Sequence, residues 1–322
     1  MGRRVGGDAA LAPLRWEIVH LVPVAHVSGI FGPLELLPML IAAALYARRA
    51  TTLAARGRPV PLWRQICFAS GLLVIALALI TPLSDLADEL VIAHMIEHLA
   101  IGDIATLLIV LGLTGPLLQP ILAIRFFDRL RILCNPLVAM PVWAFFMFFW
   151  HAPPLYDAAY GTSFVHFVEH GTFITTGILL WMPVFGPLPM PTWFTAGWKV
   201  VYVIVMRLIA TVLGNILMWD GQVLYDVYAA GQAKHHIDAV TDQSIAGVVM
   251  MVEGVFLGLG VLAWFFFRAA SEGIEKQRLL DLAFQSGVDL DPDRAQRAVA
   301  AGHGARLEAQ ILRDAERKEA VT

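Results

Sequence analysis

Residues 89–113 read ELVIAHMIEHLAIGDIATLLIVLGL, a stretch long and apolar enough to cross a lipid bilayer as one helix. It nevertheless carries His94, Glu97 and His98. Positions i, i+3 and i+4 lie on one face of a helix, so these three side chains point to the same side. Ionisable groups at membrane depth cost roughly 2.5 kcal/mol or more unless they are paired, hydrated or bound to a metal. We therefore interpret this face as a functional site.

The same H-x-x-E-H pattern occurs a second time, in an equally apolar stretch. Residues 161–184 read GTSFVHFVEHGTFITTGILLWMPV and contain His166, Glu169 and His170. A single pair of histidines in a helix is weak evidence, because a buried histidine often only bonds to a neighbour. Two copies in two expected membrane spans favour a metal or cofactor site.

The composition is that of a membrane protein with several spans. Of the 322 residues, 58% are hydrophobic and 15% are charged, and the mean hydropathy is +0.69. A net charge of −3 provides no basic surface, which argues against nucleic-acid binding. Cys67 and Cys134 lie far apart with no C-x-x-C motif, so nitrogen and oxygen atoms would have to hold any metal.

About seven segments reach the length of about 20 mostly apolar residues that a bilayer requires. The expected fold is an all-α, polytopic membrane bundle with spans at 33–50, 64–82, 89–113, 136–151, 161–184, 197–218 and 242–268. Before them, 1–32 is expected to be an interfacial N-terminal lead-in. After them, 269–322 is expected to form a charged, cytoplasmic helical tail.

The positive charges predict the orientation, because short loops rich in arginine and lysine stay in the cytoplasm. Two alternate loops are rich in arginine: Arg48, Arg49, Arg56, Arg58 and Arg64 in the first, and Arg125, Arg129 and Arg131 in the second. The intervening loops are acidic. We therefore expect a plasma-membrane protein with its N-terminus outside and its C-terminus inside, although the sequence specifies no oligomeric state.

With this topology, further polar residues reach the depth of the two H-x-x-E-H segments. His151 ends the fourth span and Asp242 begins the seventh, both on the outer side. Four helices thus supply one predicted metal site made of His94, His98, His151, His166, His170, Asp242, Glu97 and Glu169. Imidazole suits copper, zinc and iron, and a carboxylate can act as a ligand or orient a histidine. The alternative is a hydrogen-bonded polar cluster that holds helices together.

Other polar residues receive less specific interpretations. Asp103, Arg207 and Glu253 lie deeper and are expected to form a structural ion cluster, with a proton or ion path as the alternative. A packing role is expected for Met250 and Met251, with a role as soft copper ligands as the alternative. The His235-His236 pair lies in an outer loop, where it either captures a metal or is simply exposed to solvent.

Several separated motifs together resemble the CtaG-type cytochrome c oxidase assembly factors, in register from roughly Leu34 to Phe267. The matching segments are Ala93-His94-Met95 to His98, Phe149-Trp150-His151-Ala152-Pro153-Pro154-Leu155-Tyr156-Asp157-Ala158, His166 to His170, and Asp242-Gln243-Ser244-Ile245-Ala246-Gly247 with Met250.

The resemblance implies a seven-helix protein that assists assembly of a heme-copper terminal oxidase by helping copper to reach the catalytic subunit. Its matching polar positions are the five histidines and Asp242. Three carboxylates depart from the family pattern: Glu97 stands where Gln is more usual, Asp103 lies in a normally apolar segment, and Glu253 replaces a small or apolar residue. Added carboxylates harden a site and argue against a strict preference for Cu(I).

Enzymatic and electron-transfer functions fit the sequence less well. Membrane di-iron oxygenases add an H-x-x-H-H box that is missing from this sequence. Zinc peptidases with an inverted motif contain that motif once, together with a distant third ligand. Histidines on facing helices can also ligate heme, which would give the purified protein an intense Soret absorbance. We therefore expect an assembly factor or metallochaperone rather than an enzyme.

Overall fold

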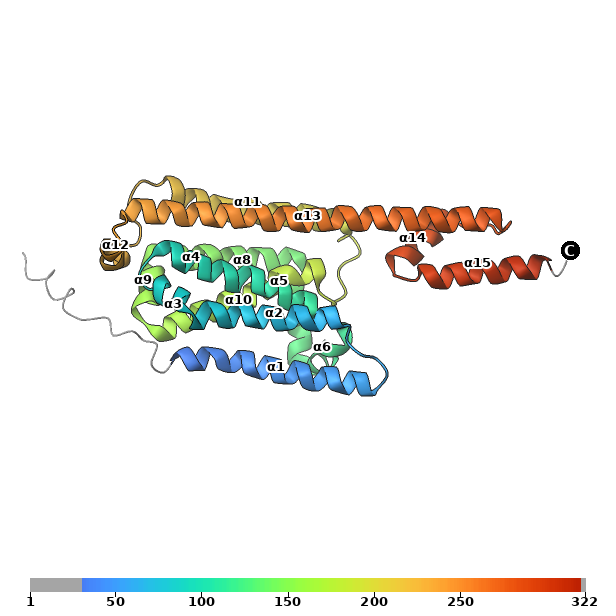
Figure 1. Ribbon diagram of the computed structural model, residues 1–322, viewed down its shortest axis with the longest axis horizontal. Coiled ribbons are helices and arrows are strands. Elements are labelled where there is room, and N and C mark those ends of the chain that lie inside the picture. Colours follow the sequence, from blue (N-terminus) through green and yellow to red (C-terminus); the bar gives the residue numbers. More distant parts are fainter. Residues whose placement is uncertain (1–30, 320–322) are drawn as a thin grey trace, which may run out of the picture.

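The computed structural model describes residues 31–319, which fold into helices with no β-strand among them (Figure 1). The expected all-α fold is confirmed, whereas nearly all of the expected lead-in lies outside the described residues. The elements are α1 (Phe31–Ala55), α2 (Leu62–Ile80), α3 (Pro82–Ala87), α4 (Val91–Leu99), the π-helix η3 (Ala100–Ile104), α5 (Ala105–Gly112), α6 (Gly115–Leu122), α7 (Arg125–Leu130), the 3-10 helix η4 (Arg131–Cys134), α8 (Pro136–His151), α9 (Pro153–Gly161), α10 (Ser163–Phe185), α11 (Ala196–Trp219), the 3-10 helix η5 (Asp226–Tyr228), α12 (Ala229–Lys234), α13 (Ala239–Gln285), α14 (Pro292–Ala300) and α15 (Gly304–Glu319).

Each of the seven expected spans coincides with helical structure. The third is a continuous run of α4, η3 and α5, in which the π-helical turn begins two residues after His98. The fourth is α8, whose proline-rich start and C-terminal His151 fall where the sequence places them. In Figure 1 the long helices lie roughly parallel, with α12 at one end of the bundle and α14 and α15 beyond the other.

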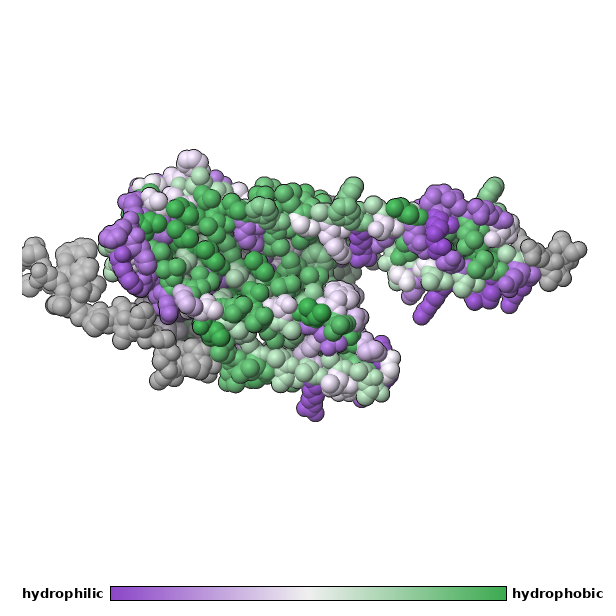
Figure 2. Space-filling view, viewed as in Figure 1, coloured by the Kyte–Doolittle hydropathy of each residue, from purple (hydrophilic) through white to green (hydrophobic). Residues whose placement is uncertain are grey.

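Several of these helices have the length and hydropathy of membrane spans. Four meet both requirements, namely α2, the α4–α5 run, α11 and α13, and a fifth does if η4 and the preceding α7 are counted with α8 across an 80° bend. Figure 2 shows apolar side chains covering the middle of the bundle. The helix α10 is 23 residues long, but its histidines, glutamate and threonines leave it outside this set. A count of seven spans therefore stays a prediction.

The helix α13 continues through the expected boundary between bundle and tail, which itself stays a prediction. It runs for 47 residues without a break, so position 268 is not the end of a helix. The change to charged residues there marks a change of surroundings, because Ala, Glu, Lys and Arg favour helix as well as apolar residues do. The Arg268 guanidinium also donates to Glu272 one turn later, at 2.8 Å, which supports the continuous helix.

The tail helices α14 and α15 fold back against the end of α13. They share a small apolar core with it, formed by Leu279, Ala283, Leu290, Ala295, Leu307 and Ile311. Arg278 on α13 also pairs with Glu308 on α15 at 2.7 Å. The part of α13 that extends past the bundle is therefore packed rather than isolated.

Glycines let the helices approach closely at the level of the H-x-x-E-H segments. A Cβ atom at Gly177 of α10 would lie only 2.0 Å from the carbonyl oxygen of Gly102 in η3. A Cβ atom at Gly247 of α13 would lie 2.5 Å from the Gly214 carbonyl of α11. Close backbone approach through small residues is typical of membrane helix packing. It holds α10 against the α4–α5 run, so the two H-x-x-E-H faces meet.

Candidate metal centre

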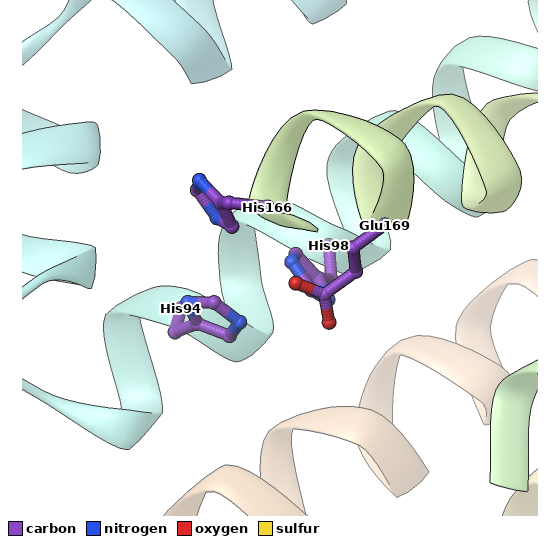
Figure 3. Close-up of side chains that lie close together, drawn as sticks. All are labelled: His94, His98, His166 and Glu169. Carbon is purple, nitrogen blue, oxygen red and sulfur yellow. The ribbon is translucent and has the colours of Figure 1, made fainter. Parts of the chain in front are cut away.

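Two helices supply the core of the candidate site. Figure 3 shows His94 and His98 projecting from α4 toward His166 and Glu169 of α10, in the space between the two helices. One ligand atom from each of these four residues lies within 4.8 Å of the others. Ligand atoms of a tetrahedral ion lie about 3.4 Å apart, so modest side-chain rotations suffice to bring the four onto one ion.

Ring distances describe how tightly the histidines gather. The ring centroids of His94 and His98 are 4.1 Å apart, and those of His94 and His166 are 5.8 Å apart. The Nδ1 atom of His98 lies 4.0 Å from Oε1 of Glu169. Three imidazoles and one carboxylate thus face a common centre.

A second set of possible ligands shares a histidine with the first. One ligand atom each from Glu97, His166 and His170 also lie within 4.8 Å of one another. The His166 and His170 rings are 4.0 Å apart, and the His98 ring lies 5.2 Å from His170. The two H-x-x-E-H segments therefore contribute all six of their ionisable side chains to one contiguous cluster.

Burial without internal partners makes this cluster suited to an ion. His94 and His98 are 5% exposed and Glu169 is 1% exposed. The Nε2 atoms of both histidines and the Oε2 atom of Glu169 make no hydrogen bond with any residue between 31 and 319. A buried polar atom without a partner costs about 1–3 kcal/mol, and coordination to a cation would remove that cost. The donor set fits copper, zinc or iron.

His151 at the end of α8 lies beside the cluster, outside both groups. Its Nδ1 atom donates to the carbonyl oxygen of Met147 at 2.7 Å, which leaves Nε2 as the acceptor. Phe173 contacts both this ring, at 6.1 Å between centroids, and that of His98, at 4.7 Å. The structure therefore brings His151 into the neighbourhood of the cluster, with its Nε2 available for a further ligand role.

Asp242 reaches the same layer but holds the backbone together there. Its two carboxylate oxygens accept the N–H groups of Val91 and Ile92 at 2.9 and 3.0 Å, and the Gln232 amide donates to it at 2.9 Å. The first N–H groups of a helix have no partner within that helix, and a carboxylate is favourable there. Asp242 thus fixes the start of α4, and neither ligand group contains it.

Three tyrosines that the sequence interpretation left without a role line the cluster on the α12 side. The hydroxyls of Tyr156 and Tyr228 are 3.0 Å apart, and the His94 ring lies 5.1 Å from Tyr156. Tyr225 donates to the His151 carbonyl at 2.9 Å. Tyr228 ends η5 and Tyr225 directly precedes it, so only the Y-x-x-Y spacing signals these two in the sequence. They separate the histidines from the α12 end of the molecule.

The expected ion cluster below the histidines is confirmed. Arg207 of α11 donates to both oxygens of Asp103 at 2.7 and 3.0 Å, and Trp181 donates to the same carboxylate at 2.9 Å. Glu253 of α13 is a more distant partner, at 3.4 Å from the guanidinium. We call Asp103, Arg207 and Glu253 the ion triad. Asp103 lies in the π-helical turn η3, and His98 lies in the turn of α4 that precedes it.

His235, which the sequence interpretation places in a loop, has surroundings that differ from those of the buried histidines. Lys234, the last residue of α12, and His235, which follows it, both contact the Glu89 carboxylate and join α12 to the start of α4. These hydrogen bonds lower the pKa of Glu89 below its ordinary value. Gly231 permits the contact, because a Cβ atom there would lie 2.1 Å from the Glu89 carbonyl oxygen. His235 thus has a structural partner, and its metal-capture role stays a prediction.

Comparison with known proteins supports the resemblance noted from the motifs. No curated protein and no solved structure gives a significant match. A family model for cytochrome c oxidase caa3 assembly factors matches residues 44–272, which include every member of the candidate metal centre and most of the helical bundle. This is well over half of the chain, and the chain therefore belongs to the cytochrome c oxidase caa3 assembly factor family.

Proposed function

We propose that this protein binds copper at its intramembrane histidine cluster and assists the delivery of that copper to the catalytic subunit of a heme-copper cytochrome c oxidase. The copper is cargo, and the protein acts as an assembly factor or metallochaperone rather than as an enzyme. The family supports a role in oxidase assembly. Copper binding rests on the cluster itself.

One observation carries the proposal, namely that buried imidazole nitrogens converge without partners of their own. His94, His98 and His166 offer nitrogen atoms and Glu169 an oxygen atom within 4.8 Å of one another. A cluster that only joined helices would use these atoms in hydrogen bonds across the interface. The Nε2 atoms of His94 and His98 make none with the described residues.

The proposed placement in the plasma membrane puts the cluster near the outer surface. Seven spans with the N-terminus outside leave α12 outside and the tail, 269–322, in the cytoplasm. Arginines support this orientation: Arg49 donates to the Pro116 carbonyl at 3.1 and 3.0 Å, and Arg64 donates to the Leu111 and Leu113 carbonyls. These residues therefore meet at one end of the bundle, opposite α12, as cytoplasmic arginines would.

A dinuclear metalloenzyme is the second candidate function. The two overlapping ligand groups contain two glutamates and share His166, so together they provide ligands for two ions. Carboxylate-rich pairs of sites on facing helices suit iron. The two candidates predict different metals and different stoichiometries, and heme ligation would instead give a Soret band.

Metal analysis of the detergent-purified protein tests the proposal. The wild type, His98→Ala and His303→Ala are compared, with His303 as a control because it is an exposed histidine in the tail. We expect at least one copper per chain in the wild type and in His303→Ala, and less than about a tenth of that content in His98→Ala. Iron in pairs would favour the dinuclear enzyme, and copper that is unaffected by His98→Ala would overturn the assignment.

A further inference from the structure

We propose that a second metal site, which we call the lower station, lies between the histidine cluster (the upper station) and the ion triad. It binds a cuprous ion through thioether and imidazole ligands, which are softer than carboxylates. It deepens the proposed function and rests on it, because the ion would reach this station from the cluster. The observations that carry it are a cavity, the side chains that line it and the charge of the neighbouring ion triad.

The cavity lies between α4, η3, α8, α10, α11 and α13. It measures about 40 Å³ and reaches from the histidines to the triad, with His98 and His151 among its lining residues at one side and Asp103, Arg207 and Glu253 at the other. A single water molecule needs about 10–15 Å³ by this measure. The space therefore holds one ion together with a small ligand or water.

Three methionines from three helices line this cavity. They are Met95 of α4, Met147 of α8 and Met250 of α13, and each is at most 5% exposed. Soft thioether ligands select Cu(I) over harder cations, and imidazole also suits copper. Packing alone, which is the role expected for Met250 from the sequence, does not require thioethers to meet at a cavity that histidines also line.

His151 completes the ligand set of this station. Its Nδ1 atom is held by the Met147 carbonyl, so the tautomer with a free Nε2 lone pair is fixed. That Nε2 atom is buried and has no hydrogen-bond partner among residues 31–319. His151 stands apart from the upper ligand groups, and the lower cavity gives its unused nitrogen a function.

The charge of the triad fits a monovalent cation. The guanidinium of Arg207 balances one of the two carboxyl groups, so ionisation of Glu253 would give the triad one excess negative charge. The Oε1 atom of Glu253 is buried and makes no hydrogen bond with the described residues. A cuprous ion in the cavity would neutralise this charge, whereas a divalent ion would leave an excess positive charge in an apolar surrounding. The carboxylates of Asp103 and Glu253 therefore act on the ion through their charge and need not be its ligands.

His98 belongs to both stations and provides the connection between them. It is part of the upper ligand group and also lines the lower cavity. A cuprous ion can move by exchanging the other upper ligands for thioether sulfur while it stays bound to His98. This exchange breaks and forms coordination bonds only, so no electron or proton has to be transferred.

Anaerobic titration of the purified protein with Cu(I), in competition with a bicinchoninate chelator, tests the second station. The test variant is Met147→Leu with Met250→Leu, because such swaps conserve volume and usually cost less than about 1.5 kcal/mol. The control is Met206→Leu, since Met206 is fully buried on α11 but does not line the cavity. X-ray absorption at the copper edge reports sulfur ligands directly.

We expect two Cu(I) per chain with a copper–sulfur signal in the wild type and in the control, and one Cu(I) without that signal in the double variant. Glu253→Gln should weaken the second site about tenfold through the lost charge. One copper without sulfur ligands in the wild type, or two in the double variant, would overturn the second station and leave the upper one standing. An unchanged affinity in Glu253→Gln would overturn the charge argument. Absence of any Cu(I) binding would overturn the proposed function as well.

Discussion

The histidine cluster and the Asp103–Arg207–Glu253 triad both place ionisable groups among apolar helices. They differ in how many of their polar atoms find a partner within the group. In the triad, Arg207 makes two hydrogen bonds of 2.7 and 3.0 Å to Asp103. In the cluster, the Nδ1 atom of His98 lies 4.0 Å from Oε1 of Glu169, and the Nε2 atoms of His94 and His98 make no hydrogen bond with the described residues. The triad therefore pairs Arg207 with Asp103 within the protein, whereas the cluster presents its ligand atoms to a common centre.

This difference distinguishes polar groups that stabilise a membrane bundle from groups that bind a ligand. An internal ion pair removes much of the cost of burying its members, so the helices that carry it are held together. Buried imidazole nitrogens without partners leave that cost in place until a cation arrives. We therefore expect changes in the triad to affect folding first, and changes in the cluster to affect metal content first.

The largest effect on stability is expected for Arg207→Leu, which leaves two carboxylates buried without their cation. Removal of one partner from a buried ion pair costs roughly 3–5 kcal/mol. Thermal unfolding in detergent should show a large loss of stability. In a matched control, Asp103→Leu and Glu253→Leu are added to it, and the triple variant should recover most of the loss because no charge stays buried. A stable Arg207→Leu protein would contradict a structural role for the triad.

A smaller effect on stability but a large effect on oxidase activity is expected for His94→Ala and His170→Ala. Loss of one ligand should weaken copper binding by at least about tenfold, since even the groups that orient ligands contribute that much. Terminal-oxidase activity in membranes should fall while the heme content stays unchanged, and added external copper should restore part of it. His303→Ala serves as the control. Full oxidase activity in both variants would show that the cluster, like the triad, is not required for metal delivery.

The sequence predicts the helices and the contact between their ionisable faces better than it predicts individual partners. Apolar length places α8 at its observed bounds, and the H-x-x-E-H spacing alone puts two imidazoles and a carboxylate on each facing side. The pairing of Arg207 with Asp103 also follows from the depth of opposite charges. These features depend on helix geometry, which is local and periodic.

The sequence does not predict features that depend on how helices begin, end and approach each other. Asp242 lies at the expected level, but its hydrogen bonds to Val91 and Ile92 depend on where α4 starts relative to α13. The continuation of α13 past position 268 also has no signal in the sequence, because a change in composition marks a change of surroundings and does not show whether a helix ends. The contact of Tyr225 with His151 comes from a loop, and no periodic pattern encodes it.

A moderate effect on stability, without a loss of copper, is expected for Asp242→Asn. An amide can accept from one of the two N–H groups but cannot replace both carboxylate contacts, and loss of such a helix cap costs about 1–2 kcal/mol. The melting temperature should fall while the copper content per chain stays at the wild-type value. Copper that disappears together with Asp242 would instead make this carboxylate a ligand, as the sequence interpretation proposed.

The smallest effect is expected at Glu89, where α12 is joined to the start of α4. Because Lys234 and His235 lower the pKa of Glu89, the contact stabilises the folded state above the ordinary pKa of 4.5 and is lost as pH falls through the lowered value. Glu89→Gln should therefore increase amide hydrogen exchange in α12 at pH 7 and have little effect in acid, where the wild-type carboxyl is already protonated. Glu272→Gln, which removes a pair in the tail, should leave α12 unchanged at both pH values. Equal exchange in Glu89→Gln and wild type at pH 7 would show that α12 does not depend on this contact. Tyr228 and Gln232 would then be enough to hold α12 in place over the cluster.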